Sequence, residues 1–169
     1  RLLSPSVSSK IAAGEVIERP ASVAKELLEN SIDAGATIIS MDLRGGGTEN
    51  LRISDNGCGI PRDELELAFR RFATSKVSDS IDLDSIGTLG FRGEALPSIG
   101  AVSTVTLASC TRDQDFGSAI NVIEGLIGEK IDHSVSNGTT VTVQNLFKNV
   151  PARLKFLRSE ATETSRIHN

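Results

Sequence analysis

The spacing of hydrophobic positions predicts one long helix early in the chain and several short ones. Between residues 20 and 34, apolar residues such as Leu27 and Ile32 follow the spacing of a helix with one buried face. Pro20 suits the first turn of that helix, and Gly35 suits the position just after its end. Shorter helices are predicted over residues 6–13 with an end at Gly14, from Pro61 through ELELAFRRFA, from GEALPSIG, and over PARLKFL.

Runs rich in β-forming residues predict strands elsewhere. TIISMDL and NLRISD, joined by GGGTE, are typical of a hairpin, and STVTLAS, SAINVIE and TTVTVQN predict three later strands. Residues 77–100 are punctuated by Gly and Ser and show little periodicity. Because helices come early and strands cluster late, we expect an α+β fold: a two-layer sandwich with a mixed, mostly antiparallel sheet and helices on one face.

Composition narrows the class of protein. The 169 residues suffice for one domain, and 38% of them are hydrophobic, with no run long enough to span a membrane. Aromatic residues make up 4%, Trp and Tyr are absent, and the net charge is −4, which argues against a basic or base-stacking nucleic-acid clamp. Cys58 and Cys110 lack metal spacing, as do His133 and His168. We expect a cytoplasmic bacterial protein, or a nuclear one if the source is eukaryotic.

The segment KELLENSIDAGA carries a polar helical face beside its apolar one. Glu26, Glu29, Asn30 and Asp33 recur at three- and four-residue spacing. Glu26 and Asn30 meet over one turn, where a carboxylate beside an amide oxygen can position a water and a hard cation such as Mg²⁺. The carboxylate can then act as general base on that water. An exposed helix face carries the same residue types, so both interpretations stay open.

The turn DNGCGIP is a second candidate. Asp55 ends a predicted strand, where its carboxylate can accept a hydrogen bond from an exocyclic amine. Gly59 allows a ligand to approach the backbone closely. A plain strand-to-helix turn with Asp55 as a local cap explains the same residues.

A glycine-rich stretch, GTLGFRGEAL, is the third. Gly87, Gly90 and Gly93 stand at every third position, and such a loop presents backbone N–H groups to an anion. The stretch is neither a P-loop nor a dinucleotide fingerprint. Upstream, Lys76 can reach a phosphate, and Thr139 in NGTTVTV begins a strand. A surface loop, a solvated lysine and an ordinary strand threonine are the structural alternatives.

One pair of motifs points to a different enzyme class. Ser22-Val-Ala-Lys25 is an S-x-x-K motif and Ser54-Asp55-Asn56 an S-D-N motif, two of the three motifs of serine penicillin-recognising enzymes. The third, K-T-G, is absent from the sequence, and the chain is short for that fold. We therefore set the hydrolase interpretation aside.

Taken in order, these segments resemble the ATPase domain of the MutL family of DNA mismatch-repair proteins. The matching strings are IAAGEVIERPASVAKELLENSIDAGAT, SDNGCGI, ATSK, GTLGFRGEALPSIGAVS and NVPARLKFLRS. They cover nearly the whole chain. The family belongs to a wider group with DNA gyrase, heat-shock chaperones of the ninety-kilodalton class and histidine kinases. The resemblance implies their ATP-binding α/β sandwich, the Bergerat fold.

The resemblance also implies roles for individual residues. Glu26 matches the general base that activates water, and Asn30 matches the Mg²⁺ ligand. Asp55 matches the carboxylate that accepts the adenine amine, and Gly59 matches the close backbone approach beneath the base. The remaining matches are the lid residues Gly90, Phe91, Arg92 and Gly93, and the pocket residues Lys76 and Thr139.

Two departures qualify this assignment. Where the family signature reads near FYNTPARRKFL, the chain reads FKNVPARLKFL, with Lys148, Val150 and Leu154 as variants in a segment concerned with domain packing. The chain lacks an initial Met and ends in SEATETSRIHN, so we expect residues 1–169 to be an N-terminal ATPase domain fragment. The family's second domain, which supplies a lysine to the γ-phosphate, and its dimerisation domain are expected to lie beyond it.

The implied function is an ATP-binding, slowly hydrolysing, Mg²⁺-dependent switch module of a DNA mismatch-repair protein. Nucleotide would order the lid and promote association of two such domains, as a homodimer or a dimer of paralogues. DNA and mismatch-recognition or other repair proteins are the implied partners. Local support for DNA binding is limited to the basic residues Arg70, Arg71, Arg153, Lys155 and Arg158. The alternative is a non-catalytic nucleotide-binding or interaction domain of the same fold, inactive when truncated.

Overall fold

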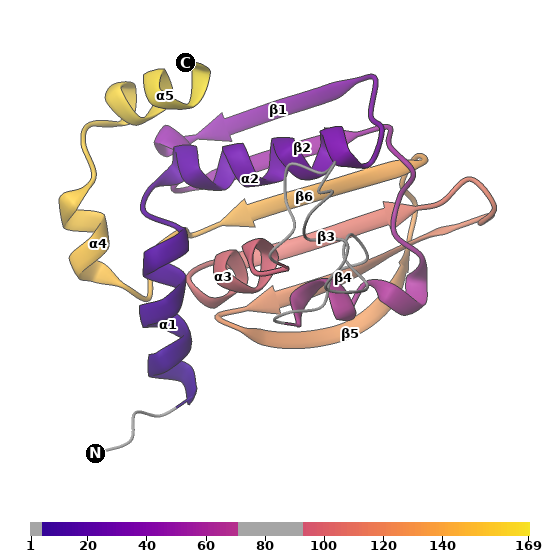
Figure 1. The fold of residues 1–169 in the computed structure, drawn as a ribbon, viewed down its shortest axis with the longest axis horizontal. Helices are drawn as coiled ribbons and strands as arrows, with labels where there is room; N and C mark the ends of the chain where they lie inside the picture. Colours follow the sequence, from indigo (N-terminus) through magenta and orange to yellow (C-terminus); the bar gives the residue numbers. More distant parts are fainter. Residues whose placement is uncertain (1–4, 71–92) are drawn as a thin grey trace, which may run out of the picture.

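The computed structural model describes residues 5–70 and 93–169 and forms a single sheet with helices on one side (Figure 1). The six-stranded sheet has the order β1-β2-β6-β3-β4-β5, and every neighbouring pair is antiparallel. The expected α+β two-layer class is confirmed. The strands are β1 Ile39–Arg44, β2 Asn50–Asp55, β3 Thr104–Cys110, β4 Gly117–Ile123, β5 Leu126–His133 and β6 Gly138–Gln144.

Three helices, α1 (Pro5–Val16), α2 (Pro20–Asp33) and α3 (Ala95–Ala101), lie over the same face of the sheet (Figure 1). The buried residues of α2 recur every three or four positions, as expected for an amphipathic helix. The helix packs against β2, in which Leu51 and Ile53 are buried and the residue between them is exposed. The fully buried side chains between the layers include Val23, Leu27, Leu51, Ile53, Ile99, Val105, Leu107 and Val143.

Two C-terminal helices, α4 (Pro151–Phe156) and α5 (Glu160–His168), complete the described chain. Helix α5 begins at Ser159, whose hydroxyl caps the backbone N–H of Thr162. On α5, Glu163 is 2% exposed, and its Oε1 accepts a hydrogen bond from the Arg158 N–H and lies 3.5 Å from Arg19 Nη1. Because Arg19 is the N-cap residue of α2, this buried charge pair joins the end of the chain to the long helix.

Several sequence-based predictions are correct, two are wrong, and two elements were not predicted. The helices at residues 20–34, GEALPSIG and PARLKFL, the hairpin and the three later strands are confirmed as α2, α3, α4, β1–β2, β3, β4 and β6. Gly14 does not end the first helix: α1 continues to Val16, because the Ile17 N–H donates to the Ala13 carbonyl oxygen. Strand β5 and helix α5 had not been predicted.

The helix expected from Pro61 is also wrong in its described part. Two short 3₁₀ turns, η2 (Arg62–Glu64) and η3 (Leu67–Phe69), take its place, and residues 71–73 lie outside the described residues. The Arg62 guanidinium donates to Asp132 on β5 and to Ser118 on β4, which ties this segment to the sheet.

Strand β6 starts at a position that admits only glycine. Gly138 has φ +118°, and a Cβ there would lie 1.9 Å from the Asp55 carbonyl oxygen on β2. Gly35, after α2, also has a positive φ of +72°, but a Cβ there would meet nothing within 4 Å. A side chain at Gly35 would therefore meet backbone strain alone, whereas a side chain at Gly138 would meet both strain and close packing.

We predict that Gly138→Ala destabilises the chain far more than Gly35→Ala. Positive φ alone costs about 1–2 kcal/mol for alanine, whereas at Gly138 strain and overpacking together cost about 3 kcal/mol or more. Urea unfolding of both variants measures the difference. Equal losses of unfolding free energy would contradict the close packing of β6 on β2.

Candidate functional site

The apolar layer between sheet and helices ends in a row of polar side chains. In the sheet register, Asp55 on β2 is opposite Thr139 on β6, and Thr139 is opposite Ser109 on β3. Residues directly opposite one another project to the same face. Each also continues the alternation of the buried Ile53, Val141 and Leu107, so all three project toward the helices. The three residues form a polar row on the face of the sheet that the helices cover.

Asp55 is tied to α2 through Ser31. The Ser31 hydroxyl lies 2.8 Å from Asp55 Oδ2 and 3.1 Å from the Leu27 carbonyl oxygen. The shorter, charge-assisted bond to the carboxylate is the stronger of the two. The other carboxylate oxygen, Oδ1, accepts from the Gly57 N–H at 2.9 Å. Both oxygens of Asp55 are therefore fixed, and the carboxylate has a set orientation.

The polar residues of α2 divide into two groups. Glu29 lies 3.0 Å from Lys25, and this hydrogen bond, with the attraction of the carboxylate, raises the pKa of the Lys25 ammonium. Glu26 and Asn30 are half-buried, and each immediately precedes a buried residue, Leu27 or Ser31. Both therefore flank the buried stripe on the same side, one turn apart. Glu29 pairs with Lys25, while Glu26 and Asn30 lie beside the buried stripe of α2.

The turn after Asp55 is packed directly onto the sheet. Gly59 has φ +76°, and a Cβ there would lie 2.4 Å from the Cys110 carbonyl oxygen. The next residue, Ile60, donates its N–H to Ser109 Oγ at 2.8 Å. The close backbone approach predicted at Gly59 is thus made to Cys110, while its approach to a ligand stays a prediction.

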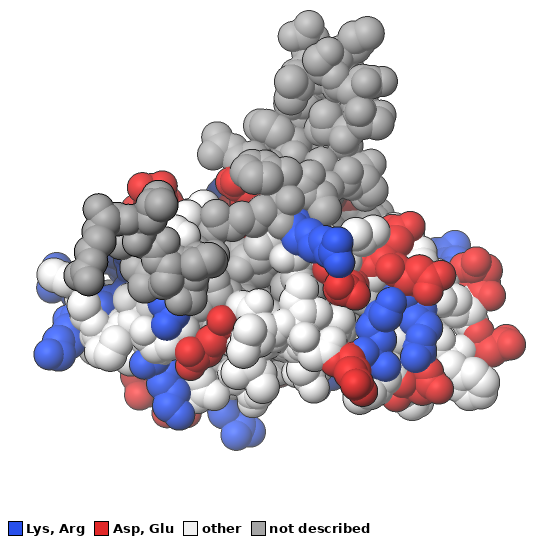
Figure 2. Space-filling view, turned by 90° about the horizontal axis from the view of Figure 1, so that it is seen from below, with Lys and Arg blue, Asp and Glu red and all other residues white. Residues whose placement is uncertain are grey.

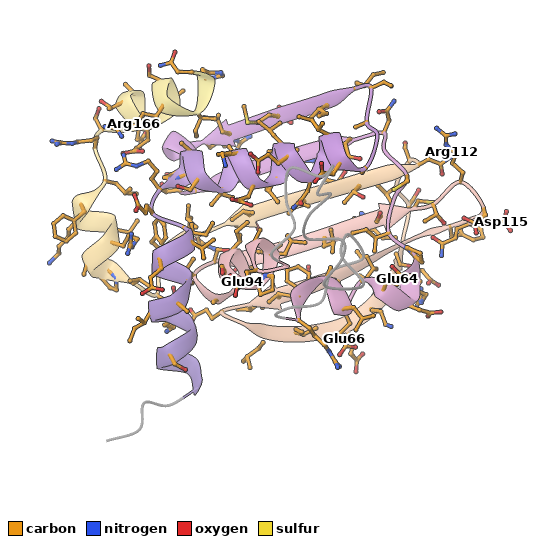
Figure 3. The ribbon with its side chains drawn as sticks, in the orientation of Figure 1. Glu64, Glu66, Glu94, Arg112, Asp115 and Arg166 are labelled. Carbon is orange, nitrogen blue, oxygen red and sulfur yellow. The ribbon has the colours of Figure 1, made fainter. Side chains whose placement is uncertain are left out.

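Not every predicted site residue is described. Gly93, with φ +61°, directly precedes Glu94, which Figure 3 labels at the start of α3. The predicted lid and phosphate residues Lys76, Gly90, Phe91 and Arg92 lie outside the described residues. The structure brings together Asp55 and Thr139, and it joins them through Ser31 to the helix that carries Glu26 and Asn30.

Two serines, Ser31 and Ser109, belong to this site and had not been singled out in the sequence. Both are buried, at 3% and 1% exposure, although serine is mostly an exposed residue. A sequence signal was present: each serine continues the spacing of buried residues on its own element. Buried hydroxyls at such positions need partners, and here the partners are Asp55 and Thr139.

A cavity of about 290 Å³ lies elsewhere, between the start of α2 and α4. It contains none of the predicted site residues, and Phe156 on its rim is 83% exposed. The site is therefore assigned from the chemistry of its side chains. The cavity is lined by Glu18, Arg19, Val150, Ala152, Arg153, Phe156 and Leu157.

Metal binding at this site would use few protein ligands. Among the described residues there is no group of three or more His, Cys, Asp and Glu side chains suited to hold a metal. The Asn30 amide and Glu26 carboxylate provide hard oxygen donors, which suit Mg²⁺ bound mainly through water and phosphate.

Among the described residues, no helix is both long and apolar enough to cross a membrane.

Comparison with known proteins shows the family of the chain. Residues 18–152 match the family described as histidine kinase-, DNA gyrase B- and HSP90-like ATPases. The chain belongs to this family. Its relatives include the DNA mismatch repair protein MutL of Xanthomonas oryzae, 54% identical over 167 residues, which are 99% of this chain and 27% of the relative. MutL of Haemophilus influenzae is 54% identical over 169 residues, with the same coverage of 99% and 27%.

Solved structures place the chain with MutL ATPase domains. The Aquifex aeolicus MutL ATPase domain complexed with ADP has a TM-score of 0.69 and 33% identity, covering 90% of this chain and 53% of that one. The N-terminal domain of a DNA repair protein has a TM-score of 0.78 and 31% identity, covering 95% and 46%. The chain is thus a MutL-type ATPase domain, and it spans 27% of the length of the full relatives named above.

Proposed function

We propose that this MutL-type domain binds ATP with Mg²⁺ and hydrolyses it slowly, as the nucleotide switch of a mismatch-repair protein. One observation carries the proposal: the Ser31–Asp55 hydrogen bond joins a fixed carboxylate to the helix that bears Glu26 and Asn30. A purine-binding acceptor and a water-activating carboxylate are then parts of one rigid unit. Phosphoryl transfer needs such positioning more than covalent chemistry.

Each residue has a distinct part in this proposal. Asp55 accepts a hydrogen bond from the adenine amine, and Thr139 lines the same end of the pocket. Glu26 orients a water and takes its proton during attack on the γ-phosphate. Asn30 is the protein ligand for Mg²⁺, which, when bound, offsets the negative charge of the phosphate oxygens. Gly90, Phe91, Arg92 and Gly93, with Lys76, would enclose the phosphates.

The wider role follows from the family. We propose that ATP orders the lid, promotes association of two such domains, and changes affinity for DNA and mismatch-recognition proteins in the bacterial cytoplasm. On the face shown in Figure 2, both signs of charge occur among the described residues, with basic side chains more frequent at the left of the view and acidic ones more frequent at the right. We further propose that a lysine from a second domain is needed for full hydrolysis.

A non-catalytic nucleotide-binding domain is the competing proposal, and Glu26 separates the two. We predict that Glu26→Gln keeps ATP affinity but slows hydrolysis by about 100-fold or more, because the amide cannot accept the proton from water. Single-turnover hydrolysis of labelled ATP at high protein concentration measures the rate. Glu29→Gln is the matched control and should hydrolyse ATP at the wild-type rate. Wild-type hydrolysis by Glu26→Gln would favour the non-catalytic domain.

The effect of Mg²⁺ on ATP affinity should require the Asn30 side chain. We predict that chelating Mg²⁺ weakens ATP binding by about tenfold or more, and that Asn30→Ala binds ATP at the chelated level whether or not Mg²⁺ is present. Calorimetric titration with a non-hydrolysable analogue measures both. Asp33→Asn, a change on the same polar face, serves as control. Full Mg²⁺ dependence in Asn30→Ala would remove Asn30 from the metal site.

Adenine recognition should depend on the charge of Asp55. We predict that Asp55→Asn loses ATP affinity by about tenfold or more, because a charge-assisted hydrogen bond is lost and an amide group faces the Ser31 and Gly57 donors. Asp42→Asn, an exposed change on β1, controls for lost charge. Calorimetry on samples with wild-type circular dichroism gives the result. Unchanged affinity in Asp55→Asn would place the base elsewhere.

A further inference from the structure

A buried serine controls the hydrogen-bonding direction of a residue in the proposed base pocket. Ser109 on β3 is 1% exposed, so its hydroxyl has only protein partners. Its Oγ lies 2.8 Å from the Ile60 backbone nitrogen, 2.8 Å from the Gly138 carbonyl oxygen and 2.9 Å from Thr139 Oγ1. A serine hydroxyl has one proton to donate and two lone pairs with which to accept. Three partners therefore use its full capacity.

Counting protons fixes the direction of each bond. The Ile60 N–H only donates, so Ser109 accepts there. The Gly138 carbonyl oxygen only accepts, so the single proton of Ser109 goes to it. The remaining lone pair of Ser109 must then accept from Thr139, whose hydroxyl proton points at Ser109. The reverse direction would place the Ser109 and Gly138 oxygens 2.8 Å apart with no proton between them.

The direction of this bond determines what Thr139 can offer a ligand in the proposed pocket. With its proton held by Ser109, Thr139 Oγ1 has only lone pairs to offer a ligand. Asp55, directly opposite Thr139 in the register, is a carboxylate whose oxygens also only accept. The side chains at this end of the sheet therefore form a row of acceptors. The two N–H bonds of an exocyclic 6-amine can be donated to both acceptors, whereas a 6-keto oxygen at the same position would face their lone pairs.

We propose that Ser109 is a positioning residue for base selection: by holding the Thr139 proton, it makes the pocket favour a purine with an exocyclic 6-amine over one with a 6-keto group. This inference deepens the proposed ATP binding and rests on it. Ser109 acts through Thr139 and has no contact with the ligand.

The test compares ATP with inosine triphosphate, which carries a keto group in place of the 6-amine. The ratio of the two affinities, measured calorimetrically with Mg²⁺, should fall about threefold to tenfold in Ser109→Ala, because the freed Thr139 hydroxyl can turn and donate to the keto oxygen. Thr139→Val should lower the ratio similarly, and the double variant should fall no further. A purely structural role for Ser109 would weaken both nucleotides equally and leave the ratio unchanged.

The outcomes separate this inference from the proposed function. An unchanged ratio in a folded Ser109→Ala variant, with wild-type ATP binding still dependent on Asp55, would overturn the role of Ser109 alone. A wild-type chain that binds neither nucleotide would overturn both. If Ser109→Ala does not fold, NMR of the wild-type chain decides. We expect a Thr139 hydroxyl proton protected from exchange with a nuclear Overhauser contact to Ser109, and an unprotected proton would contradict the inference.

Discussion

The hydrogen bond between Ser31 and Asp55 connects the helical layer to the sheet at the polar row formed by Asp55, Thr139 and Ser109. One partner is buried on α2 and the other ends β2, so the bond fixes helix and sheet relative to each other. As a result, the Asp55 carboxylate is held against the helix that carries Glu26 and Asn30. In the proposed function, Asp55 binds the base and Glu26 the water, and the two groups would lose the alignment that phosphoryl transfer requires if their elements moved separately.

Close backbone packing supports that bond from the sheet side. At Gly138, β6 approaches the Asp55 carbonyl oxygen too closely for any side chain, and at Gly59 the following turn approaches Cys110 in the same way. Both glycines permit contact of backbone on backbone, and Ser109 then bonds to the turn and to β6 together. Asp55 is therefore held by its side-chain bonds and by the packing of its own main chain. The Asp55 carboxylate thus has a fixed orientation within the protein itself.

The sequence predicted the parts of the fold whose signals are local. Helix α2 has an apolar stripe with Pro20 at its start and Gly35 after its end, and the paired strands alternate cleanly. Strand β5 lacks such a signal, because it is an edge strand with seven of its eight residues exposed. Helix α5 is held by buried Glu163 against Arg19, a contact 144 positions apart in sequence (163 − 19) that no local pattern reveals. Read from the residues alone, Asp55 and Thr139 are separate candidates, and only the family resemblance implies that both belong to one nucleotide pocket. Their placement side by side follows from the strand register, which required the structure.

The two buried serines show why residue type alone underdetermines this site. Ser31 and Ser109 have the same hydroxyl, yet Ser31 gives its proton to a carboxylate while Ser109 gives its proton to a carbonyl and accepts from Thr139. The first arrangement leaves Asp55 as a fixed acceptor, and the second leaves Thr139 as another. In the proposed base pocket, the direction of hydrogen bonding would thus be set by buried serines behind Asp55 and Thr139, the residues proposed to touch the base. Because these hydroxyls are shielded from water, no solvent molecule can substitute for a missing partner, and the direction of each bond is determined by the protein donors and acceptors around it.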